Sequence, residues 1–117
     1  MKLRDVQKLL EAKVITGEDK LDDEARYVFG CDLMSDVLAF VKGETILLTG
    51  LTNIQTIRTA EMTDIKCIIF VRGKQPDTNV IKMADELGIC LMYTKYIMYT
   101  SCGILYENGL RGADVYI

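Results

Sequence analysis

The sequence lacks several residue types and patterns on which common functions depend. None of its 117 residues is histidine, which removes the commonest general base and the base of a Ser–His or Cys–His nucleophile system. Neither G-x-x-x-x-G-K-[ST] nor G-x-G-x-x-G occurs, so the two phosphate-loop fingerprints give no support to nucleotide hydrolysis or dinucleotide binding. We therefore predict no catalytic residue and expect that the protein is not an enzyme.

Clustered positive charge and long apolar runs are also missing. The net charge is −3 and no stretch is densely basic, which argues against a nucleic-acid partner because phosphate neutralisation requires a clustered cationic face. No apolar run reaches the length of a membrane span. The N-terminal segment MKLRDVQKLLEAK has charges mixed through it and does not resemble a secretion signal. We expect a cytoplasmic location without a membrane partner.

The four cysteines show no metal-binding or redox spacing. Cys31, Cys67, Cys90 and Cys102 form no C-x-x-C pair and have no histidine to join them. Cys67 and Cys90 lie in apolar, strand-like runs, which is typical of buried reduced thiols that behave as small hydrophobic groups. A metal or redox site is the alternative. We predict no metal site and no cofactor.

The residues that are present describe a folded α/β chain. Half of them are hydrophobic and a quarter are charged, as in globular proteins, and the length predicts a single domain over 1–117. Apolar runs at 44–50, 66–71 and 89–94 are nearly evenly spaced, with a helical pattern in each gap. Right-handed crossovers would make these strands parallel. We predict a three-layer α/β fold with a mostly parallel sheet of about four to six strands and helices on both faces.

The remaining elements follow from periodicity and capping residues. Asn53, with Thr52 as a competitor, and either Asp77 or Thr78 are expected to cap helices, and Gly88 is expected to end one. The acidic segment 17–25 predicts a solvated loop, 108–112 a loop, and 113–117 a terminal strand or tail. Further strands are predicted at 13–17 and 26–30, and helices at 3–11, 33–41, 53–62, 78–87 and 96–106.

Polar residues follow each of the three central strands. In an open parallel sheet, ligands usually bind beyond the carboxyl ends of the strands, where helix amides, hydroxyls and cations could hold a small anion or nucleotide phosphate. The alternative is that such corners need Gly, Thr and Asn for geometry alone. We call these positions the rim, and they are the predicted ligand-binding residues: Thr49, Gly50, Thr52, Asn53, Arg72, Gly73, Lys74 and Thr94.

Two stretches indicate an interface. Tyrosine and methionine are dense in LMYTKYIMYTSCGILY (91–106), and Met34, Val37 and Leu38 form an apolar stripe. Such residues are enriched in interface cores, although packing in the domain core would explain part of them. We expect a homodimer.

Two segments resemble the halves of the DRTGG domain. VFGCDLMSDVLAFVKGETILLTGLTNIQTI matches the order of the first half, and CIIFVRGKQPDTNVIKMADELGICLMYTKYIMYTSCGIL matches the second, so the likeness covers residues 26–106. Gly73 and Pro76 agree with the family, as do Leu87, Gly88 and Thr94. The family's Asp-Arg pair is replaced by Gly50 and Leu51, its second acid by Asn53, and its Thr-Gly-Gly turn by Arg72, Gly73 and Lys74.

The resemblance implies a small α/β domain similar to the N-terminal domain of the kinase/phosphorylase that acts on the phosphocarrier protein of sugar transport. Such domains are usually regarded as regulatory or dimerisation units without catalytic activity. The expected function is therefore a non-catalytic regulatory or ligand-sensing homodimer. The alternative is a scaffold that docks on an enzyme of energy or redox metabolism and binds no small ligand.

Overall fold

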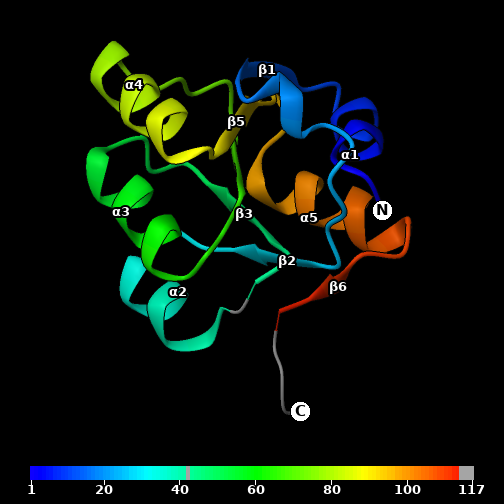
Figure 1. Cartoon of the computed structure of the whole chain (residues 1–117). Helices are drawn as coiled ribbons and strands as arrows, with labels where there is room; N and C mark the ends of the chain where they lie inside the picture. The colour runs from blue at the N-terminus through cyan, green and yellow to red at the C-terminus, as the bar shows by residue number, and fades with distance from the viewer. Residues whose placement is uncertain (42, 114–117) are drawn as a thin grey trace.

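The computed structural model describes residues 1–41 and 43–113, and over these residues the chain forms one six-stranded sheet (Figure 1). The strand order is β1-β5-β4-β3-β2-β6. All neighbouring strands are parallel except β1, which runs antiparallel to β5. The strands are β1 (Lys13–Thr16), β2 (Tyr27–Gly30), β3 (Thr45–Thr49), β4 (Cys67–Phe70), β5 (Cys90–Tyr93) and β6 (Arg111–Gly112).

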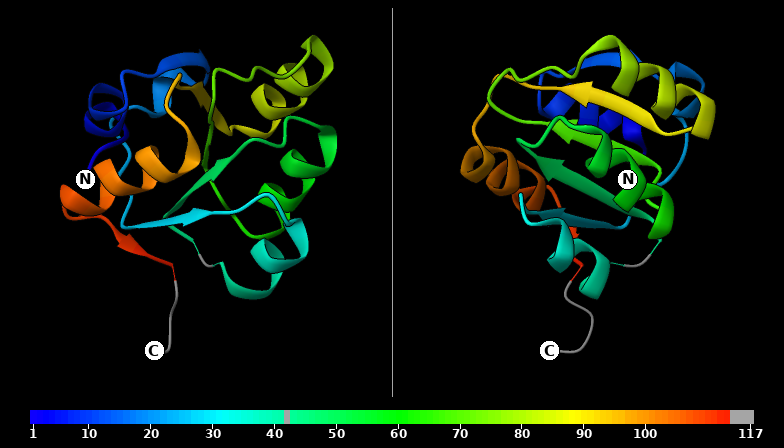
Figure 2. Two further views of the ribbon diagram at one scale, coloured as in Figure 1. Left: turned by 180° about the vertical axis from the view of Figure 1, so that it is seen from behind. Right: turned by 90° about the vertical axis from the view of Figure 1, so that its left-hand side faces the viewer.

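Helices cover both faces of the sheet, which confirms the predicted three-layer α/β fold. Figure 2 shows α2, α3 and α4 along one face and α1 with α5 on the other. This arrangement follows from the right-handed crossovers that join parallel neighbours. The helices are α1 (Leu3–Leu9), the short 3₁₀ turn η1 (Glu18–Lys20), α2 (Met34–Phe40), α3 (Ile54–Met62), α4 (Thr78–Leu87) and α5 (Met98–Glu107).

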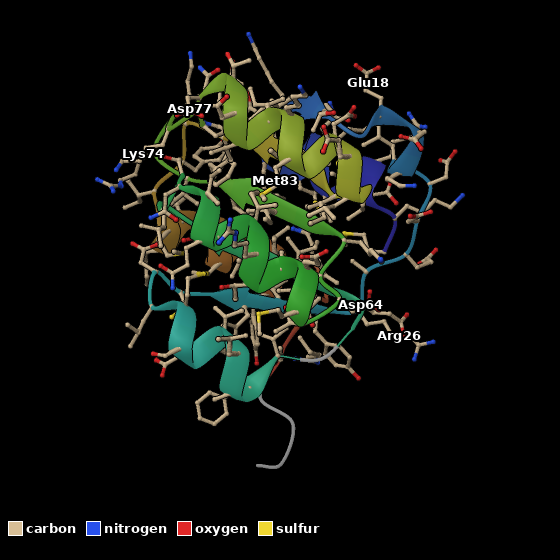
Figure 3. The ribbon with its side chains drawn as sticks, turned by 60° about the vertical axis from the view of Figure 1, so that its left-hand side comes forward. Glu18, Arg26, Asp64, Lys74, Asp77 and Met83 are labelled. Carbon is tan, nitrogen blue, oxygen red and sulfur yellow. The ribbon has the colours of Figure 1, made fainter. Side chains whose placement is uncertain are left out.

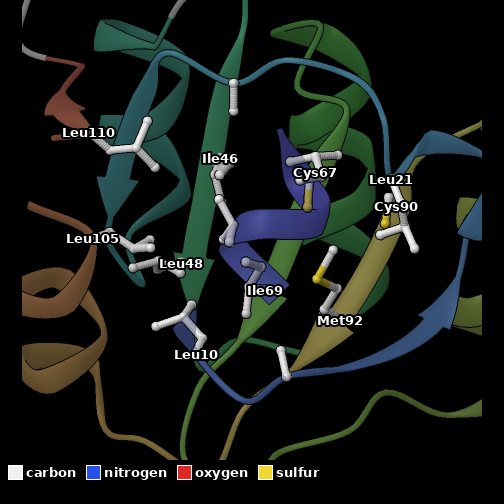
Figure 4. Packing of buried hydrophobic residues seen from close by; sticks show 14 of the residues in the cluster. Leu10, Leu21, Ile46, Leu48, Cys67, Ile69, Cys90, Met92, Leu105 and Leu110 are labelled. Carbon is white, nitrogen blue, oxygen red and sulfur yellow. The ribbon is translucent and has the colours of Figure 1, made fainter. Parts of the chain in front are cut away.

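Alternate residues of the central strands supply two separate cores. Ile46 and Leu48 of β3 pack with α1 and α5, whereas Leu47 between them packs with α2, α3 and α4. Figure 4 shows the first of these cores, with Leu105 of α5 beside the strands. Every residue of β3 and β4 is buried, as expected for parallel strands that are covered on both faces. This double burial explains the nearly continuous apolar runs of the sequence.

The predicted caps lie where the sequence placed them. Asn53 Oδ1 accepts a hydrogen bond from Thr56 N at 3.2 Å at the start of α3. Asp77 Oδ1 accepts one from Val80 N at 3.1 Å at the start of α4. Gly88 ends α4 in the left-handed conformation with φ 72°, which glycine adopts without steric cost.

Two predicted loops are wrong in part. The acidic segment 17–25 contains η1, and its apolar residues Leu21 and Ala25 are buried in the core rather than solvated. The segment 108–112 contributes β6, which pairs with β2 through Tyr27 and Val28. Of the predicted terminal strand or tail, residues 114–117 lie outside the described residues. Within the described ranges, no helix combines the length and the apolar character needed to cross a bilayer.

Candidate ligand site at the strand ends

The sheet brings the predicted rim to one edge of the molecule. Because β3, β4 and β5 are parallel, the residues that follow them meet at the same side. Figure 3 shows Lys74 and Asp77 at this edge, with Arg26 and Asp64 at the opposite edge. The topological premise of the predicted site is confirmed, whereas ligand binding by these residues stays a prediction.

Asp32, which follows β2, organises the rim. Its Oδ1 accepts hydrogen bonds from Gly50 N at 2.7 Å and from Thr49 Oγ1 at 2.8 Å. The backbone bond from Gly50 is the main cause that lowers the pKa of the Asp32 carboxyl, and the bond from Thr49 and the charges of Arg72 and Lys74 lower it further against the opposing effect of burial. Asp32 is therefore held as a carboxylate, because each of these groups favours the charged form.

Arg72 is held in a strained backbone conformation beside this carboxylate. Its φ is 61° and that of Gly73 is 68°, a region that costs a non-glycine residue about 1–2 kcal/mol. The loop is fixed because Arg72 N donates to Tyr96 O at 2.8 Å and Gly73 N donates to Thr94 O at 2.7 Å. Such strain persists only where surrounding bonds impose it, and it occurs often at functional sites.

The glycine at position 50 leaves room for the Arg72 side chain. A methyl group at this position would lie 3.2 Å from Nη2 of Arg72 and 3.7 Å from Oδ2 of Asp32. The guanidinium and the carboxylate therefore occupy the space above the Gly50 backbone. The rim thus presents two exposed cations, Arg72 and Lys74, next to a fixed anion.

The predicted hydroxyl and amide groups are mostly engaged inside the protein. Thr94 is buried, and its Oγ1 donates to Leu10 O at 2.7 Å and accepts from Tyr96 N at 3.3 Å. Thr49 is likewise buried and bound to Asp32. Asn53 caps α3. The structure therefore brings these residues to the rim mainly as its framework, while Arg72 and Lys74 point charge outward.

Asp32 was absent from the predicted site. The sequence did contain a signal, because Asp32 lies two positions after the predicted strand 26–30, just as the rim residue Thr52 lies two positions after the predicted strand 44–50. The rule applied to the three central strands applies equally to β2, which is a parallel neighbour of β3. The omission came from applying the rule only to the strands at 44–50, 66–71 and 89–94.

Within ranges 1–41 and 43–113, no group of three or more cysteine, aspartate or glutamate side chains comes together in a way that could hold a metal ion. Cys67 and Cys90 face each other across β4 and β5 and are buried, as predicted. A hydrogen bond to Cys90, together with burial, raises the pKa of the Cys67 thiol. A protonated, buried thiol is a poor nucleophile and metal ligand.

A second surface feature lies beside α5. A groove of about 680 Å³ runs between this helix and the edge formed by β2 and β6. Tyr99 and Tyr106 line it with exposed fractions of 84% and 62%. The guanidinium carbon of Arg111 lies 5.4 Å from the centre of the Tyr106 ring. The groove contains none of the eight predicted rim residues.

Comparisons with known proteins agree with this architecture. The DRTGG domain family model matches residues 5–107. The fold is similar to the crystal structure of the CBS and DRTGG domains of the regulatory region of Clostridium perfringens pyrophosphatase complexed with its activator, diadenosine tetraphosphate. The TM-score is 0.73 at 15% identity, over 89% of this chain and 45% of that chain.

This chain thus spans less than half the length of that solved structure, and the low identity makes the likeness one of fold. A comparison with curated proteins gives no match. The family model nevertheless covers most of the chain, from within α1 to the end of α5. This chain belongs to the DRTGG domain family.

Proposed function

We propose that this domain is a non-catalytic regulatory module that acts as a homodimer and binds a small anion, or the phosphate group of a nucleotide, at the rim. The observation that carries the proposal is the strained Arg72, whose guanidinium lies above Gly50 and close to Asp32. The backbone bonds to Tyr96 O and Thr94 O impose this conformation and hold the arginine at the strand ends. A guanidinium held there suits a phosphate ligand, because guanidinium groups bind phosphate oxygens in pairs.

The charges at the rim favour a phosphorylated ligand over a simple halide. Arg72 and Lys74 supply two positive charges, and Asp32 Oδ1 is occupied by Gly50 and Thr49. The second carboxylate oxygen is the natural acceptor for a hydroxyl group. A ligand with a phosphate and a neighbouring hydroxyl would satisfy both kinds of group.

The same residues argue against chemistry at the rim. The lowered pKa of Asp32 makes it a weak general base, because an efficient one has a pKa near the working pH. The hydroxyls of Thr49 and Thr94 are bound to Asp32 and to a backbone carbonyl. The sequence has no histidine to activate them.

The fold neighbour supports the choice of ligands to test first. That protein is the regulatory region of a pyrophosphatase, and its activator is a dinucleoside polyphosphate. Phosphorylated nucleotides are therefore the leading class, followed by acyl phosphates and inorganic phosphate.

Thermal unfolding with added ligand tests the proposal. At a concentration about ten times the dissociation constant, a ligand stabilises the folded state by about 1.4 kcal/mol, which would raise the Tm by about 5 °C in a domain of this size. The panel is inorganic phosphate, acetyl phosphate, AMP, ATP and diadenosine tetraphosphate at millimolar concentration. We expect at least one to raise the Tm of the wild-type protein.

The matched variants are Arg72→Gln and Arg58→Gln. Arg58 is an exposed arginine on α3, so its replacement changes the net charge equally without touching the rim. The shift should vanish in Arg72→Gln and persist in Arg58→Gln. A panel without any shift would rule out the ligand, and a shift retained by Arg72→Gln would place it elsewhere.

A second candidate function is favoured by the apolar groove beside α5. A scaffold that docks on an enzyme of energy or redox metabolism would need such a surface and no ligand at the rim. Co-purification of the full chain from its native host separates the two. A stoichiometric partner enzyme together with no thermal shift would favour the scaffold.

A further inference from the structure

Helix α5 carries a glycine near its middle that no contact with the described residues 1–41 and 43–113 explains. Gly103 is exposed, and a methyl group at its position would meet no atom within 4 Å. Its φ is not in the positive range. In a helix interior, glycine costs about 1 kcal/mol relative to alanine. No contact among the described residues requires a glycine here, and an exposed glycine in a helix is suited to the close approach of another backbone.

The surroundings of Gly103 indicate a protein surface as that neighbour. Tyr99 lies one helical turn before it and Tyr106 one turn after it, so the three residues share one face of α5. Both tyrosines are largely exposed and border the groove of about 680 Å³. Tyrosine side chains are enriched at protein interfaces and among their hot spots. Figure 1 shows α5 next to the edge strand β6, on the side of the sheet away from α2, α3 and α4.

We infer that α5 packs antiparallel on α5 of a second copy, with the two helices crossing at Gly103. The inference rests on the homodimer of the proposed function and assigns its surface. The α5 stripe, formed by Tyr99, Gly103 and Tyr106, is self-complementary, because the two tyrosines lie at nearly equal distances along the helix before and after Gly103. A two-fold axis at the crossing places Tyr99 of each copy beside Tyr106 of the partner subunit. A two-fold interface requires this matching of a patch with itself, whereas docking on an unrelated protein does not.

The charges at the ends of the stripe favour the antiparallel direction. Lys95 is exposed just before α5 begins, and Glu107 is exposed at its last residue. An antiparallel crossing puts each lysine at the end where the partner subunit carries its glutamate. A parallel crossing would bring like charges together, which costs free energy. Antiparallel helix dipoles add to the same preference.

An exposed apolar segment at the end of α2 provides the matched control. Leu38 and Phe40 of α2 are 45% and 40% exposed, and they lie on the opposite face of the sheet from α5. Ala39 stands between them and is also exposed. An arginine at position 39 therefore adds the same charge as an arginine at position 103, to an exposed apolar segment on the other side of the sheet from α5.

Sedimentation of the full chain over a concentration series tests the inference with Gly103→Arg and Ala39→Arg. Because the space at position 103 is open and arginine favours helix, the monomer fold should be retained, as circular dichroism and thermal unfolding will check. We expect Gly103→Arg to raise the dimer dissociation constant by about 30-fold or more, the size of an interface hot spot. Ala39→Arg should leave the constant unchanged.

The outcomes separate this inference from the proposed function. A wild-type chain that is monomeric throughout the series would overturn both. A dimer that survives Gly103→Arg and dissociates in Ala39→Arg would overturn the α5 interface and leave the homodimer intact. If Gly103→Arg unfolds, Tyr99→Arg replaces it, since the 84% exposed Tyr99 side chain is not needed for folding. Dissociation by Tyr99→Arg would support the inference, and its failure to dissociate the dimer would overturn it.

Discussion

The rim and the α5 groove both begin at the end of β2, yet they are built from opposite kinds of residue. Gly30, the last residue of β2, lines the groove, and Asp32, two positions later, organises the rim. The rim gathers a carboxylate and two cations because the parallel topology brings several strand ends together. The groove arises instead from side-chain packing between one helix and a sheet edge. Topology thus predicts where charge collects, and local packing decides where the surface is hollow.

The two regions also differ in how completely their polar groups are paired. At the rim, Thr49 donates to Asp32 and Thr94 donates to Leu10 O. Under α5, the hydroxyl of Ser101 is fully buried without a hydrogen-bond partner among the described residues. An unpaired buried hydroxyl costs about 1–3 kcal/mol. The rim is therefore a rigid framework, whereas α5 is held mainly by apolar contacts.

The largest expected effect concerns the contact that fixes α5 on β2. A methyl group at Gly30 would lie 2.8 Å from Sγ of Cys102 and 3.0 Å from Sδ of Met98. The larger Gly30→Val substitution must displace these two side chains from the strand, and we expect it to lower the free energy of unfolding by about 3 kcal/mol, as overpacking does. Urea denaturation at equilibrium measures the change.

A double variant tells whether steric contact is the cause. In a Cys102→Ala background, Gly30→Ala should cost much less than in the wild-type background, because the nearest obstructing sulfur has gone. Equal costs in both backgrounds would show that the two residues do not interact. In that case the groove would not depend on close packing of α5, and its contrast with the rim would weaken.

The next largest effect tests the framework of the rim. Thr94→Val keeps the shape of the side chain but leaves the Leu10 carbonyl without its buried donor. We expect a loss of about 2 kcal/mol in unfolding free energy. Thr52→Val, at a half-buried rim residue, should change stability by less than about 0.5 kcal/mol. Equal losses of unfolding free energy in the two variants would show that the hydrogen bond from Thr94 to Leu10 O does not add to the stability of the fold.

Much of the fold followed from the sequence because its signals are local. The alternation of Ile46, Leu47 and Leu48 between two cores, and the caps at Asn53 and Asp77, depend on neighbours a few residues away. The spacing of the apolar runs then fixed the parallel order. By contrast, the antiparallel β1 and the pairing of β6 with β2 depend on where distant segments meet, and no local pattern encodes that.

The candidate site was predictable in position but not in detail. The strand-end rule located Arg72 and Lys74, because it depends only on topology. It could not show that Thr94 would turn inward to a carbonyl of α1's C-terminal end, 84 residues away. It also could not show the left-handed φ of Arg72, which is imposed by the bond to Tyr96 O. These features arise from tertiary contacts.

A smaller effect is expected at Asp32, where charge and hydrogen bonding can be separated. Asp32→Ala removes the acceptor for Gly50 and Thr49 and should cost about 1 kcal/mol at neutral pH. Asp32→Asn keeps an acceptor oxygen and loses only the charge, so it should cost less. Urea denaturation of both variants at several pH values measures the two contributions.

The pH dependence has a defined sign. The folded pKa of Asp32 is lowered below the unfolded value of about 3.9. The charge-dependent stabilisation is therefore fully present above the unfolded pKa and is lost as the pH falls through the folded one. Wild type and Asp32→Asn should converge in stability at acidic pH. If the difference in unfolding free energy between the two proteins stayed constant down to acidic pH, the Asp32 charge would not stabilise the fold.

The smallest expected effect concerns Arg72, where a role in the fold can be separated from a role in ligand binding. Arg72→Gly removes the strain of the positive φ and should raise the free energy of unfolding by about 0.5 kcal/mol, after the larger chain entropy of glycine is allowed for. The same substitution should abolish the ligand-induced rise in Tm. Thermal unfolding with and without the phosphorylated panel measures both.

Lys74→Gly provides the control, because it removes the same charge from a residue without positive φ. It should lower the free energy of unfolding by about 0.5 kcal/mol, because glycine gives the unfolded chain more conformational freedom. It should also reduce the ligand-induced rise in Tm. Opposite signs in stability with the same sign in binding would show that the protein tolerates strain at Arg72 for the sake of its ligand. If Arg72→Gly also lowered stability, the Arg72 side chain would be part of the framework, and the strain would carry no information about binding.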